Sequence, residues 1–151
     1  MAADTLVVVD QHEILGKPAT PAAARAMLER LRGRDHQVLT GVLLRRGDAE
    51  PMQTWAGVVS TRVVMRAYTD AEIEAYIERG EPFDKAGGYA VQDQAFRPVE
   101  RLEGCYLNVV GLPLCAVAAG LRTLGVDVAA GGPPPCAYCE RGRPLVSRSG
   151  F

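Results

Sequence analysis

The sequence predicts an α/β fold in which a mixed β-sheet is flanked by helices. Strand-like and helix-like segments are interspersed along the 151 residues, and this order is typical of layered α/β domains. Residues 37–45 and 55–66 are rich in Val, Leu and Thr, as strands are. The segment 47–51 between them has turn chemistry, so these two strands are expected to form an antiparallel pair.

The first half of the chain also predicts one short strand and two helices. Residues 6–9 form a continuous apolar run, which is typical of a strand buried on both faces. Residues 20–33 begin with a threonine cap and a proline at the first helical position, and they end at a glycine, so a helix is expected there. Residues 69–80 begin with the capping box Thr-Asp-Ala-Glu and also end at a glycine, which predicts a second helix.

The second half predicts a loop, a hairpin and a last helix. The loop over residues 84–92 is expected to become partly strand towards its end. Residues 103–104, Glu-Gly, are expected to turn a hairpin into a strand over residues 105–110. Pro113 then opens an apolar helix that runs to about Gly125.

Composition limits the classes of protein to which the chain can belong. A length of 151 residues suits one domain with a core, and 48% hydrophobic with 23% charged residues is ordinary for a globular protein. The net charge of −1 gives no overall basic field to attract nucleic acid or an anionic membrane. No apolar run is long enough to span a bilayer, and the start does not resemble a signal peptide. We therefore expect a cytoplasmic protein with neither a nucleic-acid nor a membrane partner.

The four cysteines fit that location without disulfide bonds. Cys105 and Cys115 lie in apolar stretches and are expected to be small buried hydrophobic residues. Cys136 and Cys139 have the spacing of a metal or redox pair, but a zinc site would need two further ligands. Residues 131–151 are instead expected to form a Gly/Pro-rich C-terminal tail, because their Gly-Gly-Pro-Pro-Pro segment resists both helix and strand.

A loop in the middle of the chain contains residue types that suit a nucleotide. Asp84, Lys85, a pair of glycines at 87–88 and Gln92 fall within nine residues. Adjacent glycines let the backbone approach a ligand closely, a lysine meets an anion as a point charge, and an amide both donates to and accepts from a base edge. A glycine-rich turn between two elements explains the same residues, so the loop alone leaves both interpretations open.

Five other motifs accompany this loop in a fixed order: Asp4-Thr5, Leu15-Gly16-Lys17-Pro18, and the segments 33–41, 73–77 and 108–114. With these motifs in register, the chain resembles the Maf family of nucleoside triphosphate pyrophosphatases, the septum-formation-inhibitor proteins. The match runs from Asp4 to about Gly125. The resemblance therefore implies a Maf/ITPase-like domain over residues 1–130, in front of the tail.

The resemblance also implies an enzyme that hydrolyses a nucleoside triphosphate between its α- and β-phosphates. Such a reaction needs a divalent cation, Mg²⁺ or Mn²⁺, together with cationic groups that hold the pyrophosphate and a carboxylate that orients or deprotonates water. In the family the Asp-Thr aspartate is the proton acceptor, and lysines face the triphosphate. The site residues that the resemblance implies are Asp4 for catalysis, Thr5, Lys17, Lys85 and Gln92 for substrate binding, and Asp4 and Asp84 for the metal.

Considered without the resemblance, these residues have simpler explanations. Asp4 could be a turn or cap residue before a strand. Lys17 could be a solvated surface lysine in its Gly-Lys-Pro turn. Asp84 could bind a metal directly or through water, or it could only pair with Lys85.

Gln92 bears on the substrate. With the Asp-Lys-Ala-Gly opening and the Asn-Val-Val-Gly-Leu-Pro-Leu segment, the glutamine looks like the branch of the family that acts on dTTP and UTP. An amide pairs with the carbonyl and imide edge of a pyrimidine, whereas a carboxylate only accepts hydrogen bonds. Asp93 departs from the family, in which a glycine commonly follows the glutamine, and its carboxylate could stiffen the loop or disfavour a nearby phosphate.

Members of the family carry a further segment before the Asp-Thr motif, with a Ser-x-x-Arg-Arg signature, a glutamate and another lysine. Three residues precede Asp4 here, so we expect an N-terminally truncated fold that lacks those phosphate-binding arginines. Such a truncation has two explanations, a misassigned start site or a degraded copy of the gene product. The alternative function is therefore a non-catalytic nucleotide-binding or cell-division-regulating protein, and the family also implies a homodimer.

Overall fold

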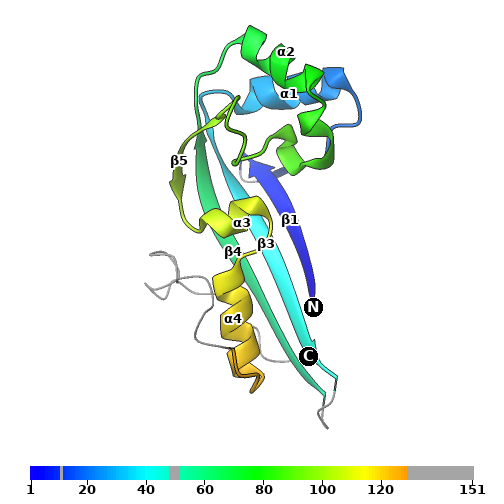
Figure 1. Cartoon of the computed structure of the whole chain (residues 1–151), viewed down its shortest axis with the longest axis vertical. Coiled ribbons are helices and arrows are strands. Elements are labelled where there is room, and N and C mark those ends of the chain that lie inside the picture. Colours follow the sequence, from blue (N-terminus) through cyan, green and yellow to red (C-terminus); the bar gives the residue numbers. More distant parts are fainter. Residues whose placement is uncertain (11, 48–51, 129–151) are drawn as a thin grey trace. The chain divides into compact units, whose positions relative to one another are not determined.

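The structure is a computed structural model that describes residues 1–10, 12–47 and 52–128. The chain divides into two compact units (Figure 1). The first unit holds residues Met1–Thr5, Leu39–Ser60 and those from Gly104 onward, and the second unit holds Leu6–Val38 and Thr61–Glu103. Strands β1, β3 and β4 contribute residues to both units.

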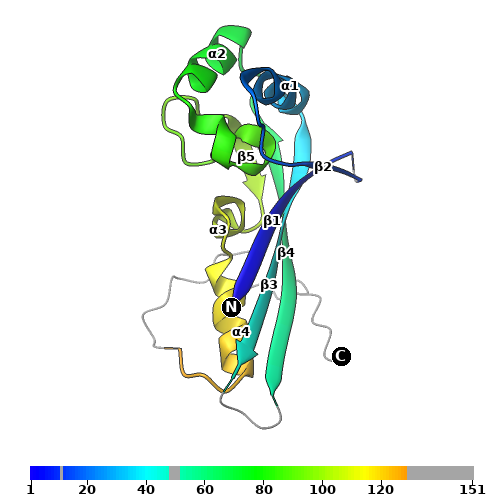
Figure 2. The same ribbon diagram turned by 90° about the vertical axis from the view of Figure 1, so that its right-hand side faces the viewer.

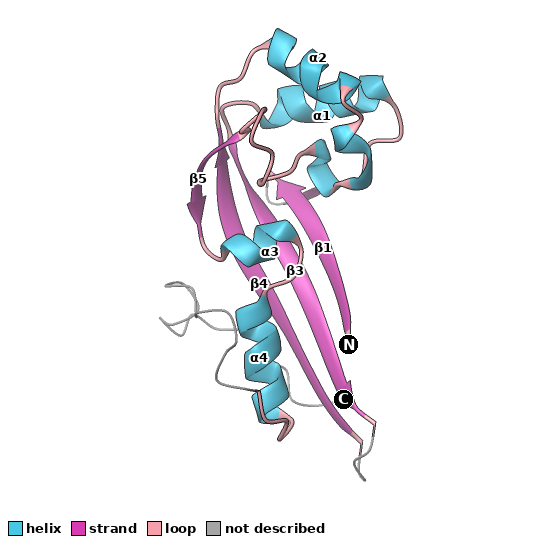
Figure 3. Cartoon of the chain, in the orientation of Figure 1, coloured by secondary structure: helices cyan, strands magenta, loops and turns pink. Residues whose placement is uncertain are grey.

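Five strands form one sheet in the order β2-β1-β3-β4-β5. Figure 3 shows β1, β3, β4 and β5 as magenta arrows. Their bounds are Ala2–Val9 for β1, Glu13–Leu15 for β2, Asp35–Arg46 for β3, Gln53–Met65 for β4 and Val99–Glu103 for β5. Within the second unit, β1 pairs with β2 so that Val7 lies opposite Leu15, and β4 pairs with β5 so that Val63 lies opposite Leu102.

The predicted α/β class is confirmed, and its sheet is antiparallel where the sequence suggested a mixed one. Strands β1 and β2, like β3 and β4, follow one another through a short connection, and such hairpins make their strands antiparallel. A parallel pair needs a longer crossover. The two long predicted strands are confirmed, with each beginning two residues earlier than expected.

Two helices of the second unit confirm the predicted caps. Helix α1, Pro21–Leu31, begins after Thr20, whose hydroxyl accepts the Ala23 N–H at 3.2 Å. Helix α2, Asp70–Glu78, begins with a complete capping box between Thr69 and Glu72. Figure 2 shows the two helices side by side. The core that they share is made of side chains at most 2% exposed: Leu28, Leu31, Tyr68, Ile73 and Tyr76.

Helix α4, Leu114–Thr123, packs against strands β3 and β4 in the first unit and confirms the predicted last helix. The buried cluster between them consists of Val42, Leu44, Trp55, Val59, Cys105, Ala116 and Leu124. Gly120 faces this cluster, and a Cβ atom placed on it would lie 2.5 Å from the Trp55 ring. The helix can therefore approach the strands closely because this position has no side chain.

The predicted strand over residues 105–110 and its hairpin are wrong. The chain forms a short helix, α3 (Tyr106–Val110), which ends at Gly111 with a φ of 123°. Its valines favour a strand by propensity, but such preferences are weak and tertiary packing overrides them. The strand of this region lies earlier, at β5, and the three-residue strand β2 also had no clear pattern in the sequence.

The prediction of partial strand at the end of the 84–92 loop is also wrong. The chain forms two 3₁₀ helices there, η1 (Glu81–Asp84) and η2 (Ala86–Gly88), followed by turns. Gly87 and Gly88 have φ values of 73° and 71°. A strand requires negative φ, so these two glycines end any extended structure.

Several predictions concern cysteines and the tail. Cys105 is buried as expected, whereas Cys115 is only partly buried, and both are free thiols. Cys136, Cys139 and the proposed tail over 131–151 lie outside the described residues, as does most of the turn at 47–51. No helix in the described ranges is long and apolar enough to cross a membrane.

Candidate functional site

The glycine loop of the second unit needs glycine at both of its adjacent positions. Gly87 and Gly88 are buried and have left-handed backbone conformations. A Cβ on Gly87 would lie 3.1 Å from a methyl carbon of Val7, and one on Gly88 would lie 3.4 Å from the ring of Pro18. The backbone of this loop therefore packs directly on β1 and on the turn that follows β2.

A hydrogen bond joins the glycine loop to that turn. The Gly87 N–H donates to the Gly16 carbonyl oxygen at 3.0 Å. Lys17 follows Gly16 and is exposed, and Lys85 precedes the glycine pair by two residues. Two turns that are about 70 residues apart in the sequence thus lie side by side, and each turn carries one lysine.

Lys85 is held by acidic neighbours. Its ammonium Nζ lies 2.6 Å from Asp84 Oδ1 and 2.7 Å from the Glu81 carbonyl oxygen, and the side chain is 27% exposed. Burial lowers the pKa of Lys85, but the hydrogen bond and charge of Asp84 and the charge of Glu81 outweigh burial and raise the pKa overall. The ammonium is therefore charged at neutral pH and is held in one place.

The carboxylate of Asp84 interacts electrostatically with both lysines, Lys85 and Lys17. Its carboxylate is 79% exposed. The hydrogen bond from Lys85 is the main cause that lowers the pKa of Asp84, and the charge of Lys17 contributes as well. The structure thus brings Lys17, Asp84 and Lys85 into one neighbourhood, and it contains the simpler Asp84–Lys85 pair that the sequence left open.

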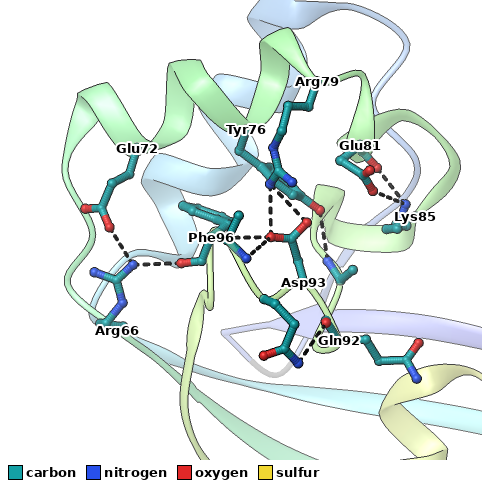
Figure 4. Close-up of polar contacts among 12 residues, drawn as sticks. Arg66, Glu72, Tyr76, Arg79, Glu81, Lys85, Gln92, Asp93 and Phe96 are labelled. Atoms are coloured by element: carbon teal, nitrogen blue, oxygen red, sulfur yellow. Dashed lines mark hydrogen bonds and ion pairs between the residues drawn. The ribbon is translucent and has the colours of Figure 1, made fainter.

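Gln92 lies on the next loop of the same unit, and its side chain is exposed (Figure 4). The side-chain amide of Gln92 has no hydrogen-bond partner within the described ranges. Its backbone carbonyl accepts a 3.4 Å hydrogen bond from Gln94 Nε2. The loop thus presents an exposed amide.

Asp4 and Thr5 belong to the first unit, on β1. Asp4 is exposed, and its Oδ1 accepts the Thr5 N–H at 2.9 Å. The Thr5 hydroxyl lies 2.9 Å from the Thr40 hydroxyl on β3, and it also donates to the Gly111 carbonyl oxygen at 3.4 Å. Thr5 is therefore tied to two other segments of its unit, while Asp4 beside it is exposed.

Two buried polar residues of β3, Thr40 and His36, contact a candidate site residue or the residue next to the glycine pair. Thr40 is fully buried and contacts Thr5. His36 is 3% exposed, and its Nε2 lies 2.7 Å from the hydroxyl of Tyr89, which follows the glycine pair. The histidine thus connects β3 to the glycine loop. The sequence carries no local signal for this contact, because the two residues are 53 positions apart.

The described residues contain no group of three or more His, Cys, Asp or Glu side chains that could enclose a metal ion. Asp4 and Asp84 each offer one exposed carboxylate. Mg²⁺ typically binds through one or two carboxylates together with the phosphates of a substrate. Either carboxylate by itself therefore fits a cation that takes its other ligands from a triphosphate, and within the described residues neither fits a cage made of protein ligands alone.

Comparison with known proteins assigns the family. The sequence model of the Maf-like protein family matches residues 1–124, so the chain belongs to the Maf family. A protein of Thermomicrobium roseum named dTTP/UTP pyrophosphatase is 48% identical over 143 residues, which cover 92% of this chain and 63% of that protein. Proteins with the same name are 47% identical in Dehalococcoides mccartyi and 48% identical in Halalkalibacterium halodurans.

These relatives are longer than the chain. The matched region covers 83% of the chain and 54% of the Dehalococcoides mccartyi protein, and 83% of the chain and 63% of the Halalkalibacterium halodurans protein. The chain thus spans between about half and two thirds of the length of the curated relatives that it matches.

Proposed function

We propose that this chain hydrolyses dTTP and UTP to the nucleoside monophosphate and pyrophosphate. One observation carries the proposal: the turns that bear Lys17 and Lys85 adjoin each other through the Gly87–Gly16 hydrogen bond. Two ammonium groups on adjoining turns, of which that of Lys85 is held in place by its neighbours, suit the oxygens of a polyphosphate. The names of the similar proteins support dTTP and UTP as the substrates.

In this proposal the lysines hold the leaving pyrophosphate. Lys85 already pairs with Asp84 at 2.6 Å, so a triphosphate competes with an exposed carboxylate for the same ammonium. Exposed ion pairs contribute about 0–1 kcal/mol. Little free energy is therefore lost when phosphate oxygens replace Asp84, and this carboxylate becomes available for other contacts.

Asp4 is the proposed proton acceptor for the attacking water. One of its oxygens accepts the Thr5 N–H, which orients the carboxylate, and the other oxygen is available to a water molecule. Thr5 and Gln92 are the proposed base-recognising residues. The Gln92 amide both donates and accepts, and therefore suits the carbonyl and imide groups that uracil and thymine share.

A divalent cation, Mg²⁺ or Mn²⁺, would be held by Asp4 or Asp84 together with the substrate. When bound, it would neutralise charge on the phosphates. The proposal further includes a Maf domain over residues 1–130 followed by a tail, a cytoplasmic location, a homodimer and a role linked to septum formation.

The test is pyrophosphate release from dTTP, UTP and GTP by the purified 151-residue chain with Mg²⁺ or Mn²⁺. We expect metal-dependent release from dTTP and UTP, and a loss of at least about 100-fold in Asp4→Asn, because general-base catalysis contributes about 10²–10⁴-fold. Asp127→Asn removes another exposed carboxylate of the first unit and serves as the matched control, with unchanged release. A folded chain that binds dTTP but releases no pyrophosphate would instead support the non-catalytic alternative.

A further inference from the structure

The loop that carries Gln92 is anchored at both ends by one tyrosine of α2. The Tyr76 hydroxyl accepts the Ala90 N–H at 3.1 Å, before Gln92. The Phe96 ring stacks on the Tyr76 ring after it, with 4.5 Å between ring centroids and 21° between planes. Tyr76 and Phe96 are 1% and 3% exposed. The two ends of the loop are therefore held by buried contacts.

Asp93 organises the middle of the same loop (Figure 4). Its Oδ1 accepts the N–H groups of Ala95 at 3.1 Å and Phe96 at 2.6 Å. The side chain of Asp93 is only 7% exposed. A buried carboxylate is costly unless it is paired, and here the pairing is complete enough to stabilise the charged form.

Arg79 provides the opposite charge. Its Nη2 lies 2.9 and 3.0 Å from the two oxygens of Asp93, and its guanidinium carbon lies 5.2 Å from the centroid of the Tyr76 ring. Burial raises the pKa of Asp93, but the hydrogen bonds from Arg79, Phe96 and Ala95 outweigh burial and lower the pKa. Arg79 directly follows α2, so this pair connects the loop to the end of a helix.

The side chain between these anchors points away from them. Gln92 directly precedes Asp93, is exposed, and makes no side-chain hydrogen bond within the described part of the chain. The neighbouring backbone is held by an ion pair, three N–H hydrogen bonds and an aromatic stack. A polar side chain that has no partner in the protein and stands on a fixed stretch of backbone is suited to bind a ligand, because the backbone that carries it loses little freedom on binding.

We propose that the Arg79–Asp93 pair positions Gln92 for recognition of the pyrimidine base. This inference rests on the proposed function and assigns the specificity of that site to two residues that do not touch the substrate themselves. It also decides between the two roles that the sequence left open for Asp93. The carboxylate stiffens the loop, and its charge is neutralised by Arg79.

The test compares UTP with CTP. Uracil presents a carbonyl and an imide N–H at the edge where cytosine presents an amine and a ring nitrogen that accepts a hydrogen bond. Asp93→Asn keeps an oxygen for the two N–H groups but removes the charge, and Arg79→Gln removes the other partner. In both variants we expect KM for UTP to rise about tenfold, which corresponds to ~1.4 kcal/mol. We expect kcat to stay within about twofold and the preference for UTP over CTP to fall about tenfold.

Arg62→Gln is the matched control. Arg62 is exposed to a similar extent, 44% against 40% for Arg79, and it pairs with Asp35 and Glu103 elsewhere in the second unit. The partners of Arg62 are 54% and 44% exposed, against 7% for Asp93, so its loss should lower the melting temperature less than the loss of Arg79 and should leave the UTP preference unchanged. Hydrogen exchange at the amides of Ala95 and Phe96 should accelerate in Asp93→Asn and not in the Arg62 variant.

Each result decides the question. An unchanged UTP preference in both variants, or equal loss in the Arg62 control, overturns the positioning role. Unchanged exchange at Ala95 and Phe96 overturns the claim that Asp93 holds the loop. If the wild-type chain releases no pyrophosphate, the proposed function fails, and the positioning role is then judged from the ratio of Kd values for UTP and CTP. A wild-type ratio near one, or a ratio that Asp93→Asn leaves unchanged, overturns it as well.

Discussion

The buried His36 makes the second unit sensitive to mild acid. The imidazole is 3% exposed, its Nε2 contacts the Tyr89 hydroxyl at 2.7 Å, and its buried Nδ1 has no hydrogen-bond partner among the described residues. Burial lowers the pKa of His36 from 6.5 to about 4, against a smaller opposing effect of the Asp35 charge. The folded state therefore contains a neutral imidazole over most of the pH range in which the unfolded chain would bind a proton.

The size of the effect follows from these two values. Between pH 6.5 and pH 4 the unfolded state binds more protons than the folded state, so stability falls as the pH is lowered through this window. At 1.36 kcal/mol for each pH unit, the complete effect is about 3 kcal/mol. About 2 kcal/mol of it is expected between pH 7 and pH 5.

The assay is urea unfolding of wild type and His36→Gln at pH 7 and pH 5, followed by far-ultraviolet circular dichroism. The glutamine amide can replace the Nε2 contact with Tyr89 and does not titrate. Tryptophan fluorescence would report on the first unit, because the single tryptophan, Trp55, lies there. Amide exchange in α1 and α2 therefore serves as the separate measurement for the second unit. We expect wild type to lose about 2 kcal/mol more than the variant when the pH is lowered.

The titration of carboxylates does not account for a difference in stability between wild type and His36→Gln at pH 5. Hydrogen bonds from Arg66 and Thr69 lower the pKa of Glu72 to about 2. Stability from such a depressed carboxylate is lost as the pH falls below about 4.5, beneath most of the histidine window, and it is the same in both proteins. Parallel losses for wild type and His36→Gln between pH 7 and pH 5 would refute the argument that burial keeps this histidine neutral.

Two further predictions concern packing and capping. Gly120→Ala places a Cβ within 2.6 Å of Trp55 and Leu44, so overpacking of about 1–3 kcal/mol should exceed the ~1 kcal/mol that alanine contributes to a helix. Urea unfolding followed by Trp55 fluorescence should show this loss of stability. The control Gly41→Ala, whose added Cβ meets no atom within 4 Å, should not show it. Equal stabilities of the Gly120→Ala and Gly41→Ala variants would contradict the close approach of α4. Thr69→Ala removes a capping box and should destabilise the chain by about 1 kcal/mol, measured by thermal unfolding, and an unchanged melting temperature would show that the cap contributes nothing.

Elements with strong local signals were predictable. The caps of α1 and α2 lie where their Thr-Pro and Thr-Asp-Ala-Glu motifs indicated, and both long strands lie where the segments rich in Val, Leu and Thr indicated. The segments 105–110 and 84–92 were predicted wrongly in part, because short segments are decided by packing and by backbone conformation more than by propensity. Helix α3 forms where a strand was predicted over residues 105–110. The positive φ values of Gly87 and Gly88 are incompatible with the strand that was predicted in part of the 84–92 loop.

The candidate site shows the same division. The residue types near the glycine loop were evident, since lysine, aspartate and glutamine have distinct chemistry at any position. Their neighbours were not: the contact between the Gly16 turn and the Gly87 turn, and the burial of His36 beside Tyr89, join segments that are more than 50 residues apart. Local or short-range patterns were enough to establish the fold class, the caps, the long strands and the residues that resemble those of the Maf family. The burial of Asp93 against Arg79, which holds the loop of Gln92, could not be predicted in this way, because that contact depends on how the end of α2 packs on a loop with no regular secondary structure.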